Sequence, residues 1–412
     1  MNVLRILLLG ADGFLGRQLK AALLAAGHEV VDAVHRPQHA GQIAVDFMRD
    51  HTAAVWLPRL AGIDVVINSV GLFRESAHAS FDAIHIHAPT ALYRACRDAG
   101  VQRVLLISAL GAAPDADTRY WRSKAEGEAA LRESGVGWNI VRPSLVYGDD
   151  GASTRLFATL AQSPLLALPA QCGKVQPIHV DDFAAGCAAL LSRVEHANRV
   201  FDATGPIALA FADYLRLLGG TQRPVLRMPQ TLCRVAARLA ETLPGALLTR
   251  DSLTMLATGN TADGRDFAAL LPHPLRDPAG FAGPAMQLRA RLGIARGWLR
   301  AGLAFVWLAT VVVSLWVYPV AASHQLLAAC HIPPLLFEPM RIGSAGLDAL
   351  FGVLTLCRPS RRLWQAQLLL IAGYSVLVAG FLPEFLIHPF GPLTKNAGLL
   401  AGLLALMATE EK

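Results

Sequence analysis

The sequence predicts a doubly wound parallel α/β sheet with a small substrate lobe, followed by an all-α bundle of four transmembrane helices. Two observations predict the sheet: an apolar strand, a glycine-rich turn and a helix open the chain, and further strands then alternate with helices. The third observation is that residues after about 298 form long apolar stretches with few charges. We expect domain boundaries at 1–150 for the core, 151–290 for the remaining sheet elements and substrate lobe, and 295–410 for the bundle.

Composition narrows the functional class. The net charge is +6, but the basic residues are scattered and form no stripe with aromatic residues, so we expect no nucleic-acid binding. No pair of the six cysteines has Cys-x-x-Cys spacing and no histidine cluster lies nearby, so neither a metal site nor a disulfide framework is predicted. The chain therefore suits a reducing, cytoplasmic setting. The apolar N-terminus is interpreted as a strand and not as a secretory signal.

The first strand, over residues 3–9, runs into the glycine-rich turn Gly10-Ala11-Asp12-Gly13-Phe14-Leu15-Gly16, and a helix is expected over 17–26. Gly10 permits the tight turn, Gly13 lets the backbone approach a pyrophosphate, and Gly16 lets the helix pack on the strand. The free N–H groups of the helix N-terminus then hold the phosphates. This spacing predicts a Rossmann-like, dinucleotide-binding core. The glycine spacing differs from the standard G-x-G-x-x-G, and a plain strand–turn–helix is the alternative.

The end of the second strand bears on the choice of nucleotide. We expect that strand over 29–34, followed by His35 and Arg36. An NAD-specific site carries an acidic residue here, whereas a cation favours the 2′-phosphate of NADP. The cofactor is therefore expected to be NADP(H), with NAD(H) as the alternative. Asp32 would bind the ribose if the strand ended two residues earlier, and Arg36 would otherwise be a solvated loop residue.

Tyr120 and Lys124 are the candidate catalytic residues. Their i, i+4 spacing places both side chains on one face of a helix that follows a strand over 103–108. An ammonium beside a phenol lowers the pKa of the tyrosine, which can then exchange a proton with a substrate oxygen while hydride moves. Ser108 could hold the same oxygen, and Lys124 could also bond the nicotinamide ribose. A surface pair without function is the alternative.

These motifs together resemble the short-chain dehydrogenase/reductase superfamily, in its extended or atypical branch, over residues 1 to about 290. The matching segments are GADGFLG at 10–16, VDF at 45–47, ISALGA at 107–112, YWRSK at 120–124, RPSLVYG at 142–148 and QPIHVDDFA at 176–184. Within the superfamily they look most like the NADPH-binding accessory subunits of respiratory complex I and their bacterial relatives. We therefore expect a respiratory complex as a candidate partner.

The resemblance also implies residue roles. Asp46 is expected to contact the adenine, Gly71 to lie over the cofactor, and Pro143 and Ser144 to flank the nicotinamide. Tyr120 is implied as acid/base, with Lys124 as its partner and Ser108 as polar support. Two features depart from the family pattern: Ser108 lies only 12 residues before Tyr120, and the position that usually holds Asn in the helix after Gly71 is assigned to His87.

The middle of the chain is less informative. His179, Asp181 and Asp182 could bind a metal or transfer protons, but a strand-to-helix junction in which Asp181 caps a helix starting near Phe183 is preferred. A capped amphipathic helix is expected over Thr249 to Thr258. The segment from Gly259 to Gly283 is rich in Gly and Pro and is expected to include the linker.

Four membrane spans are predicted, at Trp298 to Val317, Ile342 to Leu356, Leu363 to Leu382 and Pro392 to Ala408. Arginines cluster before the first span and between the second and third. This positive-inside pattern predicts a multi-pass protein of the inner (plasma) membrane, with both termini and the Rossmann-like domain on the cytoplasmic side. A soluble helical domain is the alternative.

Residues 295–410 resemble the DoxX-like membrane family. The resemblance rests on a second span that contains Asp348 and on the segment HPFGPLTKN at 388–396. A carboxyl within a span marks a functional site unless the membrane interface hydrates it, so both interpretations of Asp348 stay open. Lys395 is either functional or an interfacial anchor.

The function expected from these features is that of a membrane-tethered, NAD(P)-dependent oxidoreductase that moves hydride between its cofactor and a carbonyl or alcohol. The lipid bilayer suggests a small, lipophilic substrate such as a quinone, an isoprenoid or a lipid. Two alternatives stay open. One is a non-catalytic NADPH-binding scaffold or assembly factor of a membrane or respiratory complex, and the other is a nucleotide-sugar epimerase or dehydratase.

Overall fold

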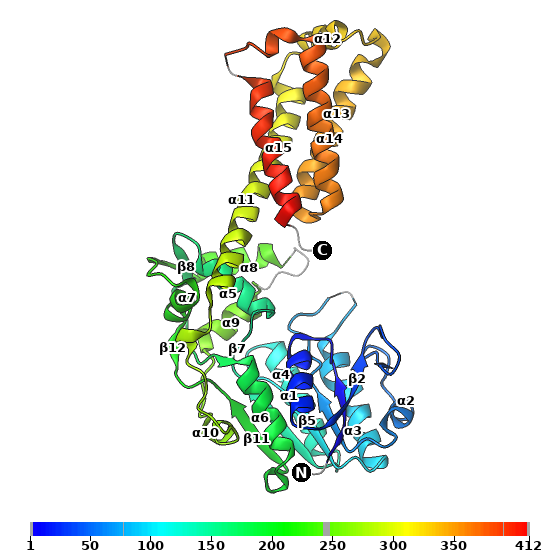
Figure 1. The fold of residues 1–412 in the computed structure, drawn as a ribbon, viewed down its shortest axis with the longest axis vertical. Helices are drawn as coiled ribbons and strands as arrows, with labels where there is room; N and C mark the ends of the chain where they lie inside the picture. Colours follow the sequence, from blue (N-terminus) through cyan, green and yellow to red (C-terminus); the bar gives the residue numbers. More distant parts are fainter. Residues whose placement is uncertain (1–2, 77, 242–247, 390, 410–412) are drawn as a thin grey trace. The chain divides into compact units, whose positions relative to one another are not determined.

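The computed structural model describes residues 3–76, 78–241, 248–389 and 391–409 (Figure 1). The chain divides into two compact units, Met1–Gln287 and Leu288–Lys412. The division lies within helix α11 (Pro284–Val312).

The first unit is built on a seven-stranded sheet in which every neighbouring pair is parallel. The spatial order is β11-β6-β5-β4-β1-β2-β3, so the order reverses between β1 and β4. The strands are β1 (Arg5–Leu9), β2 (Glu29–Val34), β3 (Ile43–Ala44), β4 (Val65–Asn68), β5 (Arg103–Ile107), β6 (Trp138–Pro143) and β11 (Arg199–Ala203). The predicted doubly wound sheet is confirmed, and ligands of such sheets bind where the order reverses.

Helices cover both faces of the sheet, which explains why its strands are almost continuously apolar. Along β1, Ile6 and Leu8 enter one core with α1 (Phe14–Ala25) and α6 (Val180–Leu191), whereas Leu7 and Leu9 enter the opposite core. That second core includes residues of α2 (Ala53–Trp56), α3 (Ala88–Asp98) and α4 (Arg119–Arg132). The alternation follows from the two-residue period of a strand.

A smaller lobe has its own core, formed around Tyr147, Phe211, Tyr214 and Phe281. Its helices are α5 (Ala152–Ala161), α7 (Phe211–Gly219), α8 (Gln230–Ala240) and α9 (Arg250–Thr258), whereas α10 (Arg265–Ala268) packs on the sheet core. Three two-stranded sheets pair β7 (Val146–Tyr147) with β10 (Ile178–His179), β9 (Lys174–Val175) with β12 (Leu209–Ala210), and β8 (Leu166–Pro169) with β13 (Val225–Met228). The capped helix expected here is confirmed, because Thr249 and Ser252 form a reciprocal capping box at the start of α9.

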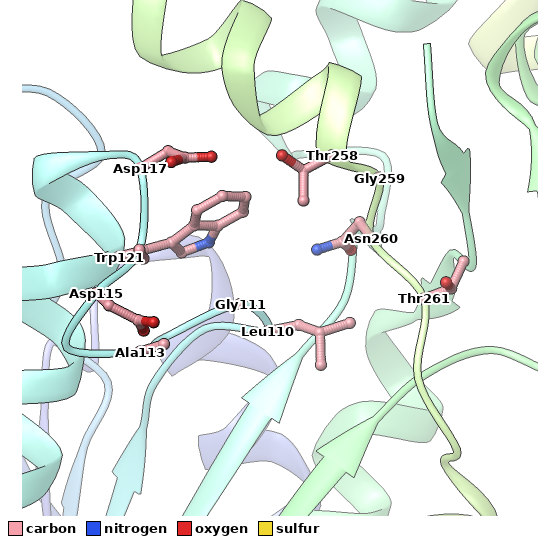
Figure 2. A pocket seen from close by; sticks show the side chains of 11 residues that line it. Leu110, Gly111, Ala113, Asp115, Asp117, Trp121, Thr258, Gly259, Asn260 and Thr261 are labelled. Carbon is pink, nitrogen blue, oxygen red and sulfur yellow. The ribbon is translucent and has the colours of Figure 1, made fainter.

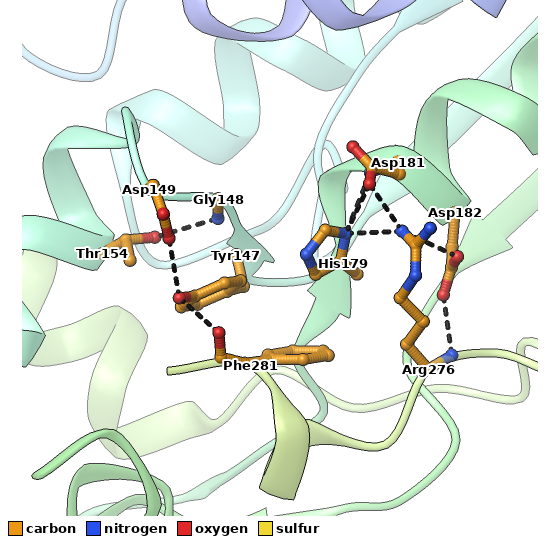
Figure 3. Close-up of polar contacts among 9 residues, drawn as sticks. All are labelled: Tyr147, Gly148, Asp149, Thr154, His179, Asp181, Asp182, Arg276 and Phe281. Atoms are coloured by element: carbon orange, nitrogen blue, oxygen red, sulfur yellow. Dashed lines mark hydrogen bonds and ion pairs between the residues drawn. The ribbon is translucent and has the colours of Figure 1, made fainter. Parts of the chain in front are cut away.

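Two predictions for this region are wrong. The segment 259–283 is not a linker, because Phe267 is fully buried in the sheet core and packs against α6. The helix after β10 starts at Val180, and His179 caps it by accepting a hydrogen bond from the N–H of Asp181 (3.2 Å). Asp181 instead pairs with Arg276 at 2.8 Å, which ties the segment to the start of α6 (Figure 3).

The second unit is all-α. It contains the C-terminal part of α11, then α12 (Val320–Ala329), α13 (Phe337–Cys357), α14 (Arg361–Phe381) and α15 (Pro392–Thr409). Among the residues that the structure describes, three helical stretches are long and apolar enough to cross a membrane, at Pro284–Val317, Pro334–Cys357 and Arg361–Phe381, and the apolar helix Leu393–Thr409 is shorter. The helical bundle expected after residue 295 is confirmed, and the fourth predicted span, Pro392 to Ala408, corresponds to the helix that is shorter than a candidate span.

Polar side chains lie inside this bundle. The indole N–H of Trp307 donates to Gln367 (2.9 Å), whose amide donates to the Thr355 hydroxyl (2.8 Å), so three helices share one hydrogen-bonded chain. Asp348 is only 6% exposed. Inside a bilayer such groups are retained where they bond to one another across helices. The role of Asp348 stays a prediction.

Short helical turns complete the chain. The 3₁₀ turns are Leu57–Leu60, Val194–His196, Pro278–Gly280, Pro334–Leu336 and Pro383–Phe385, and the π-helical segments are Asp82–His87 and Val313–Val317.

Candidate functional site

The glycine-rich turn lies at the carboxyl end of β1, beside the point where the strand order reverses. Gly10 has a φ of +77°, and its carbonyl accepts the N–H of Gly13 at 3.0 Å. A Cβ on Gly16 would lie 1.9 Å from that same carbonyl oxygen, so no larger residue fits. The backbone roles predicted for these two glycines are confirmed.

Helix α1 starts earlier than predicted, at Phe14 and not at Arg17. Gly13 takes the N-cap position in an extended conformation, so Phe14, Leu15 and Gly16 form the first turn. The first N–H groups of a helix have no acceptor within it and carry its positive dipole end. A Cβ on Gly13 would meet only the Gly10 carbonyl oxygen, at 3.1 Å, so the space beside this residue is open. A pyrophosphate can therefore approach the N–H groups of the turn.

The residues expected around the adenosine follow β2 and β3. Strand β2 ends at Val34 as predicted, and His35 and Arg36 are exposed directly after it. Asp32 is engaged elsewhere, since its carboxylate pairs with Lys20 at 2.7 Å. Asp46 stabilises the turn after β3 by accepting the N–H of Met48 at 2.9 Å.

Tyr120, Lys124 and Gly71 come together at the carboxyl edge of β4 and β5. Lys124 is 7% exposed, and its ammonium donates to the carbonyl of Ile107 at the end of β5 (3.2 Å). The same nitrogen would lie 3.3 Å from a Cβ on Gly71. Tyr120, one turn earlier on α4, is half-buried. Its ring neighbours are Phe73, Phe81 and His85, with centroids 5.3, 6.0 and 5.9 Å away.

His85 is the site residue that sequence reasoning missed. The sequence analysis assigns His87 to the position near Gly71, but the structure places His85 there. His85 Nε2 accepts the N–H of Leu72 (3.1 Å), so Nδ1 carries the proton and donates to the Ser123 hydroxyl (2.8 Å). His87 instead contacts the ring of His51. The cause is the π-helical segment Asp82–His87, whose wider turn shifts the inward-facing position relative to an α-helix.

Burial controls the protonation of this cluster. It lowers the pKa of His85 to about 2, with the charge of Lys124 adding to the effect, so the imidazole is neutral. Burial also lowers the pKa of Lys124 to about 8, against the opposing charge of Glu128. The pKa of Tyr120 is raised to about 12 by burial. The predicted lowering of the tyrosine pKa by Lys124 is therefore wrong for this structure, and the phenol is neutral.

Ser108 faces a different partner from the one expected. Its hydroxyl donates to Glu128 at 2.6 Å. Glu128 is completely buried and also accepts two hydrogen bonds from Arg142 (2.8 and 2.6 Å) and one from Arg132 (2.9 Å). The proton of Ser108 is thus engaged, and its oxygen can act only as an acceptor.

The remaining two predicted residues lie at the end of β6. Pro143 is the last residue of that strand, and its carbonyl accepts the N–H of Leu110 at 3.1 Å. The hydroxyl of Ser144 donates to the carbonyl of Gln176 (2.6 Å). Ser144 therefore supports the loop that follows β6, and its proton is not directed at Tyr120.

Comparison with protein families matches the chain in two places. Residues 10–192 match the NAD(P)H-binding family model, and residues 304–404 match the DoxX-like family model. The chain joins an NAD(P)H-binding domain to a DoxX-like domain. The glycine-rich turn belongs to the first match, and the fit of that turn to a pyrophosphate agrees with it. The helical bundle contains the second match.

Curated relatives resemble the NAD(P)H-binding domain. A mitochondrial NADH dehydrogenase [ubiquinone] 1 alpha subcomplex subunit 9 from Dictyostelium discoideum is 28% identical, covering 53% of this chain and 65% of the relative. A ceramide reductase from Caulobacter vibrioides is 35% identical, covering 44% of this chain and 58% of the relative. The chain thus spans about three fifths of the length of these relatives.

Solved structures show the same fold. An NADPH-dependent quinone oxidoreductase from Escherichia coli, crystallised with NADPH, aligns with a TM-score of 0.53 at 21% identity, covering 66% of this chain and 97% of that chain. The NAD(P)H-binding domain therefore has the Rossmann-like architecture that the sequence predicted.

Proposed function

We propose that the protein is a membrane-anchored oxidoreductase that prefers NADP(H) and exchanges hydride with a carbonyl or alcohol group of a lipophilic substrate. The observation that carries the proposal is the convergence of Tyr120, Lys124 and Gly71 at the carboxyl edge of the sheet. The similarity to a ceramide reductase supports a lipid substrate, and the DoxX-like domain supports a substrate that partitions into the bilayer.

In this proposal, different residues bind the cofactor and transfer the proton. The N-terminus of α1 binds the pyrophosphate, and the Lys124 ammonium hydrogen-bonds the nicotinamide ribose beside Gly71. When bound, NADPH supplies the hydride. The neutral phenol of Tyr120 donates a proton to the substrate oxygen, and the rings of Phe73, Phe81 and His85 restrict water around that phenol.

The preference for NADP(H) is proposed from Arg36, which is exposed directly after β2 while Asp32 is paired with Lys20. We expect Arg36→Asp to raise the Kd of NADPH by roughly 10- to 100-fold, because a charge-assisted contact with the 2′-phosphate is lost. The Kd of NADH should change less than about threefold. Fluorescence titration of both nucleotides measures this, with the exposed Arg94→Asp as a control. An equal loss for both nucleotides would contradict the assignment.

A pH dependence follows from Lys124. Its ammonium is charged below the pKa of about 8, and Tyr120 stays neutral up to about 12. Both groups therefore have the form required for reduction below pH 8, and kcat/KM for NADPH should fall as the pH rises through that value. Spectrophotometry at 340 nm measures it, using a quinone, a long-chain ketone and the keto form of a ceramide-class lipid as oxidants.

Lys124→Arg tests the origin of this decline. Arginine keeps its charge, so the fall near pH 8 should disappear from the profile, although overall activity is lower because the side chain is larger. A variant whose profile matches that of the parent would assign the decline to another group. If no oxidant in this panel consumes NADPH, the proposed reductase activity is refuted.

We also propose a cytoplasmic orientation of the NAD(P)H-binding domain in a multi-pass inner-membrane protein. Arginines 289, 291 and 296 lie in the N-terminal part of α11, and Arg358, Arg361 and Arg362 lie after the end of α13 and in the first turn of α14. The loops of the opposite side carry fewer basic residues.

A second candidate function is that of an NADPH-binding scaffold or assembly factor for a respiratory complex. The similarity to a subunit of NADH dehydrogenase favours it. This function requires tight NADPH retention without turnover, and co-purification with respiratory subunits would support it.

A further inference from the structure

Helix α8 of the smaller lobe exposes an apolar face. Its buried side consists of Cys233 and Ala237, which pack against α9. The side chains of Leu232, Val235 and Leu239 are 50, 56 and 67% exposed. Their spacing of three and four residues places all three on one face of the helix. Because a surface helix normally directs polar side chains outward, this face indicates a contact with an apolar partner.

Basic side chains border the apolar face. Arg234 and Arg238 lie one turn apart on α8, and Arg227 precedes the helix in β13; all three are exposed. The chain contains no acidic residue between Asp213 and Glu241, so the segment carries a concentrated positive charge. An apolar face bordered by arginines is typical of a helix that lies in the interface of an anionic bilayer.

The chain also keeps this helix close to a bilayer. The unit that contains α8 ends at Gln287, and the first predicted membrane span starts at Trp298. A surface that is tethered to its partner meets that partner at a high effective concentration, so even a weakly binding helix stays docked. A lipid surface is therefore the partner that both the charge and the connectivity favour.

A cavity elsewhere in the same unit has the opposite charge. It has a volume of about 430 Å³ and opens between the loop 110–117 and the segment 258–261 (Figure 2). Asp115 and Asp117 line it and are exposed, and none of its described lining residues is Lys or Arg. An anionic surface repels these carboxylates and attracts the arginines of α8, so charge favours docking through α8.

Helix α8 is connected to the candidate active site at its C-terminal end. The guanidinium of Arg74 donates to the carbonyl of Glu241, the C-cap residue of α8. Arg74 follows Phe73, whose ring centroid lies 5.3 Å from that of Tyr120. Phe73 is itself 42% exposed. The apolar loop beside Tyr120 is therefore bonded to the helix that carries the apolar face.

We infer that α8 lies in the headgroup region of an anionic bilayer, with Leu232, Val235 and Leu239 at the hydrocarbon boundary and the arginines at the lipid phosphates. This contact holds the loop that contains Phe73 at the membrane surface, so a lipophilic substrate passes from the bilayer to Tyr120 without crossing water. The route of the substrate rests on the proposed function, whereas the docking of α8 does not.

The test uses the full-length protein in nanodiscs of phosphatidylcholine and phosphatidylglycerol. Serine replaces the exposed or partly exposed Cys172, Cys330 and Cys357, and Val235→Cys then carries an NBD fluorophore. A nitroxide near the headgroup end of the lipid acyl chain quenches the fluorophore only at short range. Quenching should be strong at position 235. It should be absent from Ala99→Cys, which lies at the exposed end of α3 on the amino edge of the sheet.

Variants separate the apolar and the basic contributions. Leu232→Asp charges the apolar face and should abolish quenching at position 235. Leu24→Asp changes an equally exposed leucine of α1 (51% against 50%) and should leave quenching unchanged. Arg234→Gln combined with Arg238→Gln should lower the ratio of docked to undocked protein by roughly 10- to 30-fold, because each basic residue near an anionic surface contributes about a factor of five.

Turnover in the same nanodiscs tests the route of the substrate. Leu232→Asp should raise KM for a long-chain ketone at least about tenfold, because the undocked site loses its high local concentration of membrane-bound substrate. The value of kcat/KM for a short, water-soluble ketone should stay close to that of the parent. An equal loss for both ketones would refute the route.

The docking of α8 is overturned if the lipid nitroxide fails to quench the fluorophore at position 235, or if it quenches position 99 equally. A shift of the emission to shorter wavelength without lipid quenching would also overturn it, because the face would then contact protein, such as a second copy of the chain. Docking without NADPH consumption would refute the proposed reductase and keep the membrane contact. NADPH consumption without docking would refute the membrane contact alone.

Discussion

Tyr120→Phe is expected to lower kcat with NADPH by roughly a hundredfold to ten-thousandfold, which is the usual contribution of a positioned proton donor. The phenol is half-buried beside His85, and burial keeps its pKa at about 12, so it holds a proton at every pH used for assay. Phenylalanine preserves the ring contacts with Phe73 and Phe81 and removes only the hydroxyl. Stability and the Kd of NADPH should therefore stay close to those of the parent.

The measurement is steady-state NADPH consumption, together with nucleotide titration of the same preparation. Tyr147→Phe provides the matched control: the Tyr147 hydroxyl bonds to Asp149 and to the carbonyl of Phe281 (Figure 3), so its loss should lower Tm and leave kcat within about threefold of the parent. Full turnover in Tyr120→Phe would remove this residue from the mechanism. Tight NADPH binding without turnover in parent and variant alike would favour the scaffold function.

Gly16→Ala is expected to destabilise the NAD(P)H-binding domain by about 3 kcal/mol, the upper range for overpacking a core. The added Cβ would lie 1.9 Å from the Gly10 carbonyl oxygen, 2.8 Å from its carbon and 2.9 Å from the Cα of Ala11. All three atoms belong to the backbone, so no side-chain rotation relieves the overlap. The strand and helix must separate, and we expect a fall in Tm of roughly 6–10 °C and the loss of NADPH binding.

Gly13→Ala is the matched control for this experiment. Residue 13 has an ordinary φ of −71°, and a Cβ there would meet only one atom, at 3.1 Å. Its Tm should therefore stay within about 2 °C of the parent, since a single mild contact costs little. The NADPH affinity should still fall, because the methyl group occupies the approach to the pyrophosphate. Thermal unfolding with and without NADPH measures both effects, and an unchanged Tm in Gly16→Ala would contradict the packing argument.

Features that depend on neighbours in the chain are predictable from the sequence alone. The end of β2 at Val34, the parallel sheet and the capping box at Thr249 all follow from short patterns of apolar, glycine and capping residues. Such patterns act through backbone geometry and periodicity, which are local properties. The cofactor class could also be predicted from the sequence, because the glycine-rich turn is one continuous segment.

Features that depend on packing between distant segments required the tertiary structure. The inward position of His85 depends on a π-helical segment, and the engagement of Ser108 depends on Glu128, which lies 20 residues further along the chain. Burial, and not the proximity of charges, sets the pKa values of Tyr120 and Lys124. Local sequence specifies which groups are available, whereas the long-range packing of helices on the sheet specifies which of them lose water and which find partners.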